Sequence, residues 1–350
     1  MASKFKKRKR SRGIPKIIGY DGEMGNFISG LDRVGGTSSE ASRALIREIP
    51  GLAEESGRFR WSCSCSECET KRRRSVASSS RGYYSYSDIM GAASAYLVSD
   101  NHIGGAGSHA NWNPQDHDRR FMAENGGCIY IDLNHIEVCV PETRSAFDHL
   151  ACWHAQLEYL RGVLEAANAK LPEGQRVHVL VNNSDGRGNA YGSHMNFLVT
   201  RRCWQDIFER KIQYLLYLAA YQVSSIVFTG QGKVGSENGR PEVDFQLSQR
   251  ADFFEQLVGP HTTYSRPVVN SRDESHCTSS RDSSGGLEHA GSGMARLHSI
   301  FFDNTLCHGS TVLKAGVMQI VLAMIEAGRV NLGLLLEDPI RALGVWSHDP

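Results

Sequence analysis

The sequence predicts an α+β fold in which long helices pack on an antiparallel sheet. Short runs rich in β-branched and aromatic residues recur along the chain, and the clearest, Cys128 to Val140, has the pattern of a strand, a turn and a second strand. Long apolar segments at helical spacing lie among these runs. Because strands and helices do not alternate strictly, an antiparallel sheet is favoured over a doubly wound parallel one.

The expected elements follow from these patterns along the chain. We predict strands at 14–20, 128–140 (a hairpin), 177–181, 193–200, 226–229, 243–247 and 297–302. A helix is expected to open at Pro141-Glu142-Thr143 and to run to about Lys170, because apolar residues recur there near helical spacing. Two further helices are expected at 204–223 and 312–327.

The remaining stretches indicate how the domain is organised. Residues 14–350 are expected to form one domain with a mobile insertion at about 35–120, a stretch rich in Ser, Gly and Arg that would make a poor core. Residues 1–13 carry a block of Lys and Arg, which predicts a basic disordered tail. The polar, Gly/Ser-rich residues 271–294 predict a second loop.

The insertion contains three closely spaced cysteines, Cys63, Cys65 and Cys68. A zinc ion normally needs four ligands, and no close fourth Cys or His follows them. His102 or His109 could complete a site only if the fold brought one of them near. A zinc site is therefore the less favoured interpretation.

Composition excludes several classes of protein. Apolar residues make up 40% of the chain and charged residues 22%, as in globular proteins. The net charge of +1 gives no whole-molecule field for nucleic acid, so we do not expect nucleic acid as a partner. The longest apolar stretch, 310–330, is interrupted by charged residues, which predicts a buried helix and no membrane span. Nine cysteines and no apolar segment after the basic start predict reduced thiols in a cytoplasmic protein.

The densest group of chemically active side chains lies in the expected hairpin. Strand alternation puts Tyr130 and Asp132 on one face, and His135 and Glu137 share a face after the turn. Such groups are costly to bury together unless they bind a cation or transfer protons, and oxygen-rich ligands suit Mg²⁺. On this segment alone, a solvated hairpin with charged residues on its wet face is an equally good interpretation.

Two weaker signals involve acids and a Gly-rich segment. Asp21 and Glu23 would point to the same side of the first strand. The Gly-rich segment 182–192, which contains Asn183, leads into a strand that begins with Ser193 and His194. This pattern suits a phosphate-side loop followed by a metal ligand, although a single histidine is more often structural.

Basic residues near the C-terminal end supply two more signals. Arg296 and His298 open an apolar strand. Arg250, Arg266 and Arg272 are arginines of the kind that binds phosphates or carboxylates through paired hydrogen bonds.

Six blocks of sequence, in order, resemble one known family. They are GYDGEMG at 19–25, NGGCIYIDLNHIEVCVPE at 125–142, NNSDGRGNAYGSH at 182–194, FTGQGKVG at 228–235, FQLSQRADFFEQLVGPHTTYSRPVVNSRDESH at 245–276 and RLHSIFFDNTLCHGSTVLKAG at 296–316. On these blocks the chain is identified as a member of the family of the Pup ligase and the Pup deamidase/depupylase. These sister enzymes act on the C-terminal glutamate or glutamine of a small ubiquitin-like protein tag.

The resemblance implies a glutamine-synthetase-like catalytic domain of the carboxylate–amine ligase type. In it, a curved antiparallel sheet with helices on one face holds ATP and Mg²⁺, and the tag and its conjugates are the protein partners. Asp132 matches the catalytic aspartate. The implied metal ligands are Asp21, Glu23, Tyr130, Glu137, His194 and His298. The resemblance makes Arg250 and Arg272 candidates for contacts to phosphate or to the tag's carboxylate, and we predict Asn183 and Arg296 as further contacts to ATP or the tag.

Three features resemble the depupylase more than the ligase. Asp132 and Glu137 are five residues apart, where the ligase usually has one residue more. The segment DGRGNAYGSH is closer to the depupylase version, and the long interval between Glu23 and Tyr130 leaves room for a loop that depupylases carry. We therefore expect an ATP- and Mg²⁺-dependent hydrolase that deamidates the tag's C-terminal Gln or cleaves its isopeptide bond to lysine. Asp132 would attack the amide carbon or activate water.

Two alternatives remain open. A ligase would use Asp132 to deprotonate the lysine that attacks a glutamyl phosphate, and a degenerate homologue would bind ATP or the tag without turnover. Asp21 is shorter than the family's usual Glu, Ile136 replaces a Pro, and Met195 stands where a Glu usually follows the His. Because the sequence ends at Pro350, we expect the family's small C-terminal domain to be absent or supplied by a separate fragment.

Overall fold

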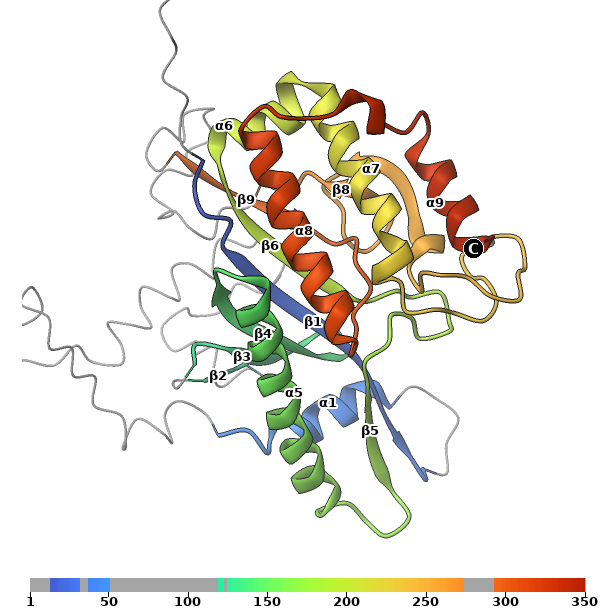
Figure 1. Ribbon diagram of the computed structural model, residues 1–350. Coiled ribbons are helices and arrows are strands. Elements are labelled where there is room, and N and C mark those ends of the chain that lie inside the picture. The colour runs from blue at the N-terminus through green and yellow to red at the C-terminus, as the bar shows by residue number, and fades with distance from the viewer. Residues whose placement is uncertain (1–12, 32–36, 51–118, 123–124, 274–292, 350) are drawn as a thin grey trace, which may run out of the picture.

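A computed structural model describes residues 13–31, 37–50, 119–122, 125–273 and 293–349, and the statements below concern these residues (Figure 1). Single helical turns lie at Asp206–Arg210, Ala251–Phe253 and Leu332–Leu334. The strands are β1 (Ile18–Ser29), β2 (Arg119–Phe121), β3 (Cys128–Asp132), β4 (His135–Thr143), β5 (Arg176–Leu180), β6 (Ser193–Thr200), β7 (Phe254–Gly259), β8 (Arg266–Asn270) and β9 (Met294–Ser299). The helices are α1 (Ser38–Ile46), α5 (Ala146–Asn168), α6 (Arg201–Gln205), α7 (Ile212–Thr229), α8 (His308–Glu326) and α9 (Pro339–His348).

The described strands form one large sheet and one small parallel pair. In the large sheet the order is β2-β3-β4-β1-β6-β9, and each neighbouring pair is antiparallel. The second half of β1 leaves β4 and β6 and pairs with β5 instead, while β7 and β8 pair in parallel. The predicted α+β class with a mainly antiparallel sheet is therefore confirmed.

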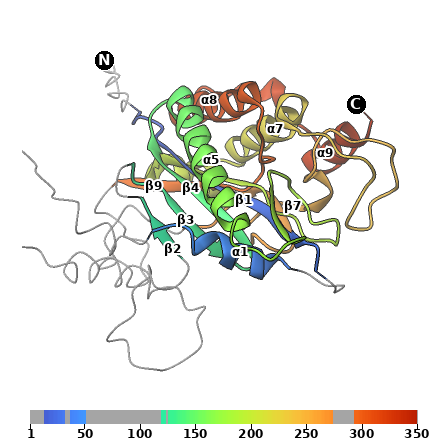
Figure 2. The ribbon, with the colours of Figure 1, turned by 90° about the horizontal axis from the view of Figure 1, so that it is seen from below.

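The large sheet has one covered face and one open face. Alternate residues of a strand point to opposite faces. Ile18, Tyr20 and Met24 of β1 are buried on the side of the helices, where the Tyr20 ring contacts Trp153 of α5. Asp21 and Glu23 point to the opposite face. Figures 1 and 2 show α5 and α8 on one side of the sheet, as the resemblance implied.

Local signals explain where the helices begin. Ser145 precedes α5, and its hydroxyl accepts a hydrogen bond from the Asp148 amide at 3.1 Å, which satisfies one of the free N–H groups of the first turn. Asp338 caps α9 in the same way, with Pro339 at the first helical position. Among the described helices, α7 and α8 have the length and hydropathy of a membrane span, but they pack on each other and contribute buried residues to the core.

The predicted boundaries of three strands were wrong. Residues 141–143 do not open a helix. They complete β4, where Thr143 pairs with Ile18, and the helix starts only after Ser145. The first strand begins at Ile18 and extends to Ser29, well beyond the predicted end at Tyr20, because its polar residues face the open side while the alternate ones stay buried. The predicted strand at 297–302 corresponds to β9 at 294–299.

Two predicted strands do not exist in the described residues. The run 226–229 is the last turn of α7, in which Ile226 and Thr229 continue the buried helical face and Val227 is exposed. Packing therefore overrides the β propensity of this run. Residues 243–247 form only an isolated bridge from Gln246 to Lys233, and the Leu247 amide donates to the Ser347 carbonyl of α9 instead.

The predicted insertion contains a helix that the sequence pattern did not predict. α1 lies inside the interval 35–120 and packs on β1 and β4, with Ala41 and Leu45 fully buried. The cysteines Cys63, Cys65 and Cys68, the basic tail before Gly13 and most of the second predicted loop lie outside the described residues. Elements β2, β7, β8 and α9 were also not predicted.

Candidate functional site

The open face of the large sheet gathers the predicted acids because neighbouring strands pair them. In the antiparallel register, Glu23 of β1 lies opposite Glu137 of β4, and Glu137 lies opposite Tyr130 of β3. On the other side of β1, Asp21 lies opposite His194 of β6. Cross-strand partners share a face of the sheet, so these side chains point into the same space.

Two groups of potential cation ligands result, and they share one carboxylate. Oxygen and nitrogen atoms of Asp21, Glu137 and His194 all lie within 4.8 Å of one another, and so do carboxylate oxygens of Glu23, Asp132 and Glu137. Carboxylate-rich sets of this kind fit hard cations such as Mg²⁺. Five of the residues predicted from the sequence therefore lie in one cluster: Asp21, Glu23, Asp132, Glu137 and His194.

The electrostatics of the cluster favour a bound cation. Burial, followed by repulsion from Asp21 and Glu23, raises the pKa of Glu137 well above its usual value. Burial also raises the pKa of Asp21 and of Glu23, although His194 and Arg250 respectively act against these shifts. Carboxylates so desolvated and so close bind either protons or a positive ion. The donor set therefore fits a divalent cation.

The two predicted histidines lie side by side on β6 and β9. Burial lowers the pKa of His194 to about 4, so the imidazole is neutral near pH 7 and has a lone pair available for a metal. Its Nδ1 lies 3.7 Å from the Asp21 carboxylate. The ring centroids of His194 and His298 are 5.3 Å apart. His298 thus borders the first cation group without belonging to it.

Tyr130 lies at the outer edge of the cluster. It is paired with Glu137, and a hydrogen bond between the two side chains lowers the pKa of the carboxyl, though less than burial raises it. The Arg119 guanidinium lies over the Tyr130 ring, 4.3 Å from its centroid. This geometry orients the phenol toward Glu137.

Two of the three predicted arginines, Arg250 and Arg266, lie near Glu23. Arg250 is 1% exposed and donates to the carbonyls of Ile300 and Phe302. Arg266 donates to the Ala190 carbonyl at 2.7 Å. Both line the cavity described below, and the positive charge of each lowers the pKa of Glu23. They are positioned to bind phosphate or carboxylate groups.

The other predicted contact residues have different positions. Arg272 does not line the cavity, and its amide donates to Asn270. Arg296 of β9 donates to Asn196 at 2.7 Å and lies on the open face near Asp21, whose pKa it lowers. Asn183 is fully buried, where its amide group donates to Gln249 and to the Asn304 carbonyl. Asn183 therefore holds its loop in place and does not face the cavity.

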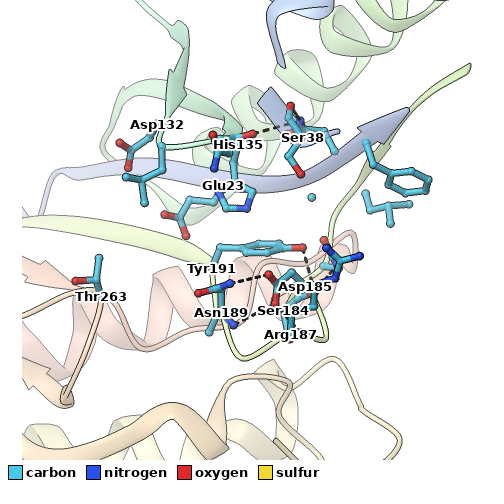
Figure 3. A pocket seen from close by; sticks show the side chains of 18 of the residues that line it. Glu23, Ser38, Asp132, His135, Ser184, Asp185, Arg187, Asn189, Tyr191 and Thr263 are labelled. Atoms are coloured by element: carbon cyan, nitrogen blue, oxygen red, sulfur yellow. Dashed lines mark hydrogen bonds between the residues drawn. The ribbon is translucent and has the colours of Figure 1, made fainter. Parts of the chain in front are cut away.

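A cavity of about 760 Å³ opens above the acids. This volume is within the range of nucleotide- and drug-sized ligand sites. Figure 3 shows Glu23, Asp132 and His135 on one side, with Ser184, Asp185, Asn189 and Tyr191 facing them across the space. The predicted phosphate-side loop 182–192 therefore lines the cavity, although through residues other than Asn183.

The loop is shaped by its own polar side chains. The Asp185 carboxylate accepts hydrogen bonds from the amides of Arg187 and Asn189, at 2.8 and 3.1 Å. The Ser184 hydroxyl lies 2.7 Å from both carboxylate oxygens of Glu237, which comes from the loop after α7. The asparagine, aspartate and glycine content of this segment was the only sequence signal for such a structure.

Two departures from the family pattern lie away from the cavity. Ile136 and Met195 are both fully buried and belong to the hydrophobic core. They alternate with Glu137 and His194 along their strands, so they face the helices. Neither side chain is a missing ligand of the cation groups.

Comparisons with known proteins agree with the sequence resemblance. The family model described as Pup-ligase protein matches residues 63–350. The chain is 37% identical over 228 residues to the depupylase of Acidothermus cellulolyticus and 36% identical over 230 residues to the Pup deamidase/depupylase of Mycolicibacterium smegmatis. It is also 36% identical over 230 residues to the Pup–protein ligase of Acidimicrobium ferrooxidans. These alignments cover 65–66% of this chain but only 41–46% of each relative, so the chain spans less than half of their length.

Two solved structures share the fold. The complex between the prokaryotic ubiquitin-like protein Pup and its ligase PafA matches with a TM-score of 0.62 at 21% identity, over 96% of this chain and 51% of that one. The Pup ligase PafA in complex with ADP matches with a TM-score of 0.51 at 25% identity, over 71% of this chain and 55% of that one.

Proposed function

This chain belongs to the Pup-ligase protein family, and from that membership we propose that it is an ATP- and Mg²⁺-dependent Pup deamidase/depupylase. Its substrates would be a Pup-like tag ending in glutamine and the isopeptide bond between the tag's terminal glutamate and a protein lysine. The observation that carries the proposal is the convergence of Asp21, Glu23, Glu137 and His194 beside Asp132. Of these five residues, Glu23, Asp132 and His194 line one cavity.

The cavity suits a nucleotide with its divalent cations. Two ligand groups sharing Glu137 would hold the cations, which supply positive charge that stabilises negatively charged oxygens of the ligand. Arg250 and Arg266 face Glu23 and would bind phosphate oxygens or the tag's carboxylate. The similar ligase PafA has been solved with ADP, which supports a nucleotide as one occupant.

Asp132 would carry the chemical step. Its side chain is exposed to the cavity at the end of β3, next to Glu23 and Glu137. The carboxylate would either attack the amide carbon of the tag's terminal residue or remove a proton from the water that attacks it. The C–N bond then breaks, and the nitrogen takes up a proton and leaves as ammonia or as the lysine amine. Where Asp132 is the nucleophile, water would then hydrolyse the anhydride between Asp132 and the tag, which releases the tag's carboxylate and restores Asp132.

The spacing in the hairpin, which resembles that of the depupylase, supports hydrolysis over ligation. Asp132 ends β3 and His135 begins β4, so the five-residue spacing to Glu137 corresponds to a two-residue turn. One more residue would require a longer turn or a bulge and would move Asp132 relative to Glu137. The relatives named depupylase and ligase have nearly equal identity to this chain, so this spacing carries more weight than identity.

Partners and location are part of the same proposal. A Pup-like tag is the proposed protein partner, since the similar structure of PafA was solved with Pup. All described cysteines are free thiols, which fits a reducing cytoplasm. The matched regions cover less than half of the length of the depupylase relatives, so the activity of the whole protein is part of this proposal.

One set of incubations tests the proposal. The chain is mixed with ATP and Mg²⁺ and with one of three substrates: tag ending in Gln, tag ending in Glu plus a lysine-containing protein, or a purified conjugate. Release of ammonia from the first and of free protein from the third is the expected result. New conjugate in the second reaction would replace the proposal with the ligase alternative.

A variant identifies the site. Asp132→Asn keeps the shape of the side chain and removes its base, so turnover should fall by about 10²- to 10⁴-fold. Full activity in this variant would overturn the assignment of Asp132. Binding of ATP without turnover of any substrate by the wild-type chain would support the degenerate homologue instead.

A further inference from the structure

The turn that follows Asp132 has a strained backbone. Leu133 has φ of +51°, in the left-handed region that residues with a side chain rarely adopt. Its side chain is 77% exposed, so packing of that side chain does not hold the conformation. Such strain persists only where surrounding contacts impose it. The contacts that fix this turn therefore also fix where Asp132 points.

The Asp132 carboxylate depends on that turn for its position. Among the hydrogen bonds of the described residues, none is made by the Asp132 side chain itself. The strand before it pairs through its backbone with β4, up to the pair Asp132–His135. The direction of the carboxylate toward Glu23 and Glu137 is thus set by the backbone of residues 132–135.

Helix α1 holds the turn from the side. The carbonyl of Asn134 accepts a hydrogen bond from the Ser42 hydroxyl at 2.8 Å, and the Asn134 side chain accepts one from Ser39. Both serines belong to α1, which packs on β3 and β4. A helix from the interval that looked irregular in sequence is therefore in contact with the catalytic turn.

One buried amide links these parts. The Asn26 side chain of β1 is 3% exposed, and its NH₂ group donates to the Ser38 carbonyl at 2.7 Å and to the Ser42 hydroxyl at 2.8 Å. Its oxygen accepts from the Ile136 amide at 2.9 Å. The amide group thus bridges the start of α1 to the strand just after the turn. Removing it would leave buried donors and acceptors without partners, which is costly.

We propose that Asn26 is a positioning residue for Asp132, acting through Ser42 of α1 and the backbone of Asn134 and Ile136. The proposal rests on the proposed function, in which Asp132 is the catalytic group. Asn26 also lies on β1 only three residues after Glu23, so one strand carries both a cation ligand and the residue that places the carboxylate beside it. Loosening the turn would move the carboxylate away from the cation group that it forms with Glu23 and Glu137.

Two variants with matched controls test this. Ser42→Ala removes one hydroxyl from a fully buried position with little change of shape, and Asn26→Leu removes the amide. The control for the first is Ser225→Ala, a fully buried serine whose hydroxyl donates within α7. The control for the second is Asn168→Leu, whose amide donates to and accepts from Val177. Neither control residue lines the cavity.

Turnover and cation binding are measured separately. We expect kcat to fall by about 10- to 10²-fold in both test variants, as for a misplacement of about 1 Å, while KM changes less than about twofold. Mn²⁺ affinity should also fall, and neither substitution should reduce it further in the Asp132→Asn background, because coupled residues are non-additive. Losses no larger than those of the controls, or additive losses, would overturn the proposal.

The Mn²⁺ titration separates this proposal from the proposed function. A wild-type chain that binds Mn²⁺ but turns over none of the three substrates would contradict the deamidase/depupylase activity. The positioning role of Asn26 would then be supported if Asn26→Leu and Ser42→Ala lowered Mn²⁺ affinity more than their controls did, and contradicted if they did not. A wild-type chain with neither turnover nor Mn²⁺ binding would overturn both.

Discussion

The two faces of the large sheet are built from alternate residues of the same strands, yet they have opposite physical character. On the covered face, Ile18 and Met24 of β1 and Phe197 of β6 are fully buried against helices. On the open face, the same strands carry Asp21, Glu23 and His194. Neighbouring positions on one strand therefore belong to different environments, 180° apart.

This difference separates what stabilises the fold from what serves the chemistry. Burial of the apolar side chains is the main favourable contribution to folding. The clustered carboxylates oppose folding when no cation is bound, since burial raises the pKa of Asp21, Glu23 and Glu137, and repulsion from neighbouring carboxylates adds to the rise at Asp21 and Glu137. Functional clusters of this kind commonly cost stability. Substitutions on the covered face should accordingly lower stability and leave cation binding unchanged. Substitutions of the open-face carboxylates should weaken cation binding without lowering stability.

The largest effect on stability is expected on the covered face. Phe197→Ala should lower the free energy of unfolding by about 3–5 kcal/mol, because it leaves a cavity in the packed layer between sheet and helices. Urea denaturation measures this change. Phe245→Ala, at a side chain that is 47% exposed, is the control and should lower stability by less than about 1 kcal/mol. Loss of Mn²⁺ affinity in the folded Phe197→Ala protein would show that the two faces are not independent.

The next largest effect is expected at the shared ligand on the open face. Glu137→Gln removes a charged oxygen from both cation groups, so Mn²⁺ affinity should fall by about 10²-fold or more, which exceeds the loss expected from residues that only hold a ligand in place. Stability without cation should not fall, since the repulsion among the carboxylates decreases. The control Glu142→Gln changes an exposed carboxylate on the same strand. A stability loss in Glu137→Gln comparable to that of Phe197→Ala would contradict the division between the faces.

The pH dependence of the same variant gives a smaller effect with a defined sign. Folding raises the pKa of Glu137 above its value in the unfolded chain, which is near 4.5. Protonation of Glu137 therefore stabilises the folded state, and this stabilisation is fully present below the unfolded pKa. It is lost as the pH rises through the pKa of Glu137 in the folded state. Without cation, Glu137→Gln should therefore melt higher than the wild type by about 2 °C or more at pH 8, and the difference should shrink toward pH 5. Thermal melts at both pH values measure it. Addition of Mg²⁺ should reduce the difference at pH 8, and a difference that grows as pH falls would refute the assignment.

The sequence alone could predict which face of a strand a residue lies on. It could not predict which strands lie next to each other in the sheet. Asp21, Glu23 and Glu137 were predicted as ligands, and alternation within each strand sufficed to orient them. Their convergence depends on the order β4-β1-β6, which joins residues more than a hundred positions apart. No local sequence pattern predicts this strand order, so the convergence of these residues could be expected only from the family resemblance.

Loops and short helices were harder to predict for a different reason. Asn183 was expected to contact the ligand because it lies in a Gly-rich segment, but its amide turns inward to Gln249 and Asn304. α1 was hidden in a polar stretch because only a few of its residues are buried. Both outcomes depend on tertiary hydrogen bonds, which composition and periodicity do not contain.

The smallest effect is expected at the loop that closes the cavity. Ser184→Ala removes the hydroxyl that donates to Glu237, so stability should fall by about 1 kcal/mol. The loop carries no residue of the two cation groups, which are built on β1, β3, β4 and β6. Mn²⁺ affinity should therefore stay within about twofold of the wild type, whereas ATP affinity should fall by about three- to tenfold, as one hydrogen bond's contribution implies.

A control and a contrary result make this last comparison decisive. Ser224→Ala removes an exposed hydroxyl that donates within α7 and should change neither affinity. Both affinities are measured by calorimetric titration of the same preparations, first with Mn²⁺ alone and then with ATP. If Ser184→Ala lowered the affinity for Mn²⁺ as much as the affinity for ATP, the acidic residues on the strands would not form a cation site that is independent of the loop. The sheet would then fix only the direction of the carboxylates, and the loop would complete the site.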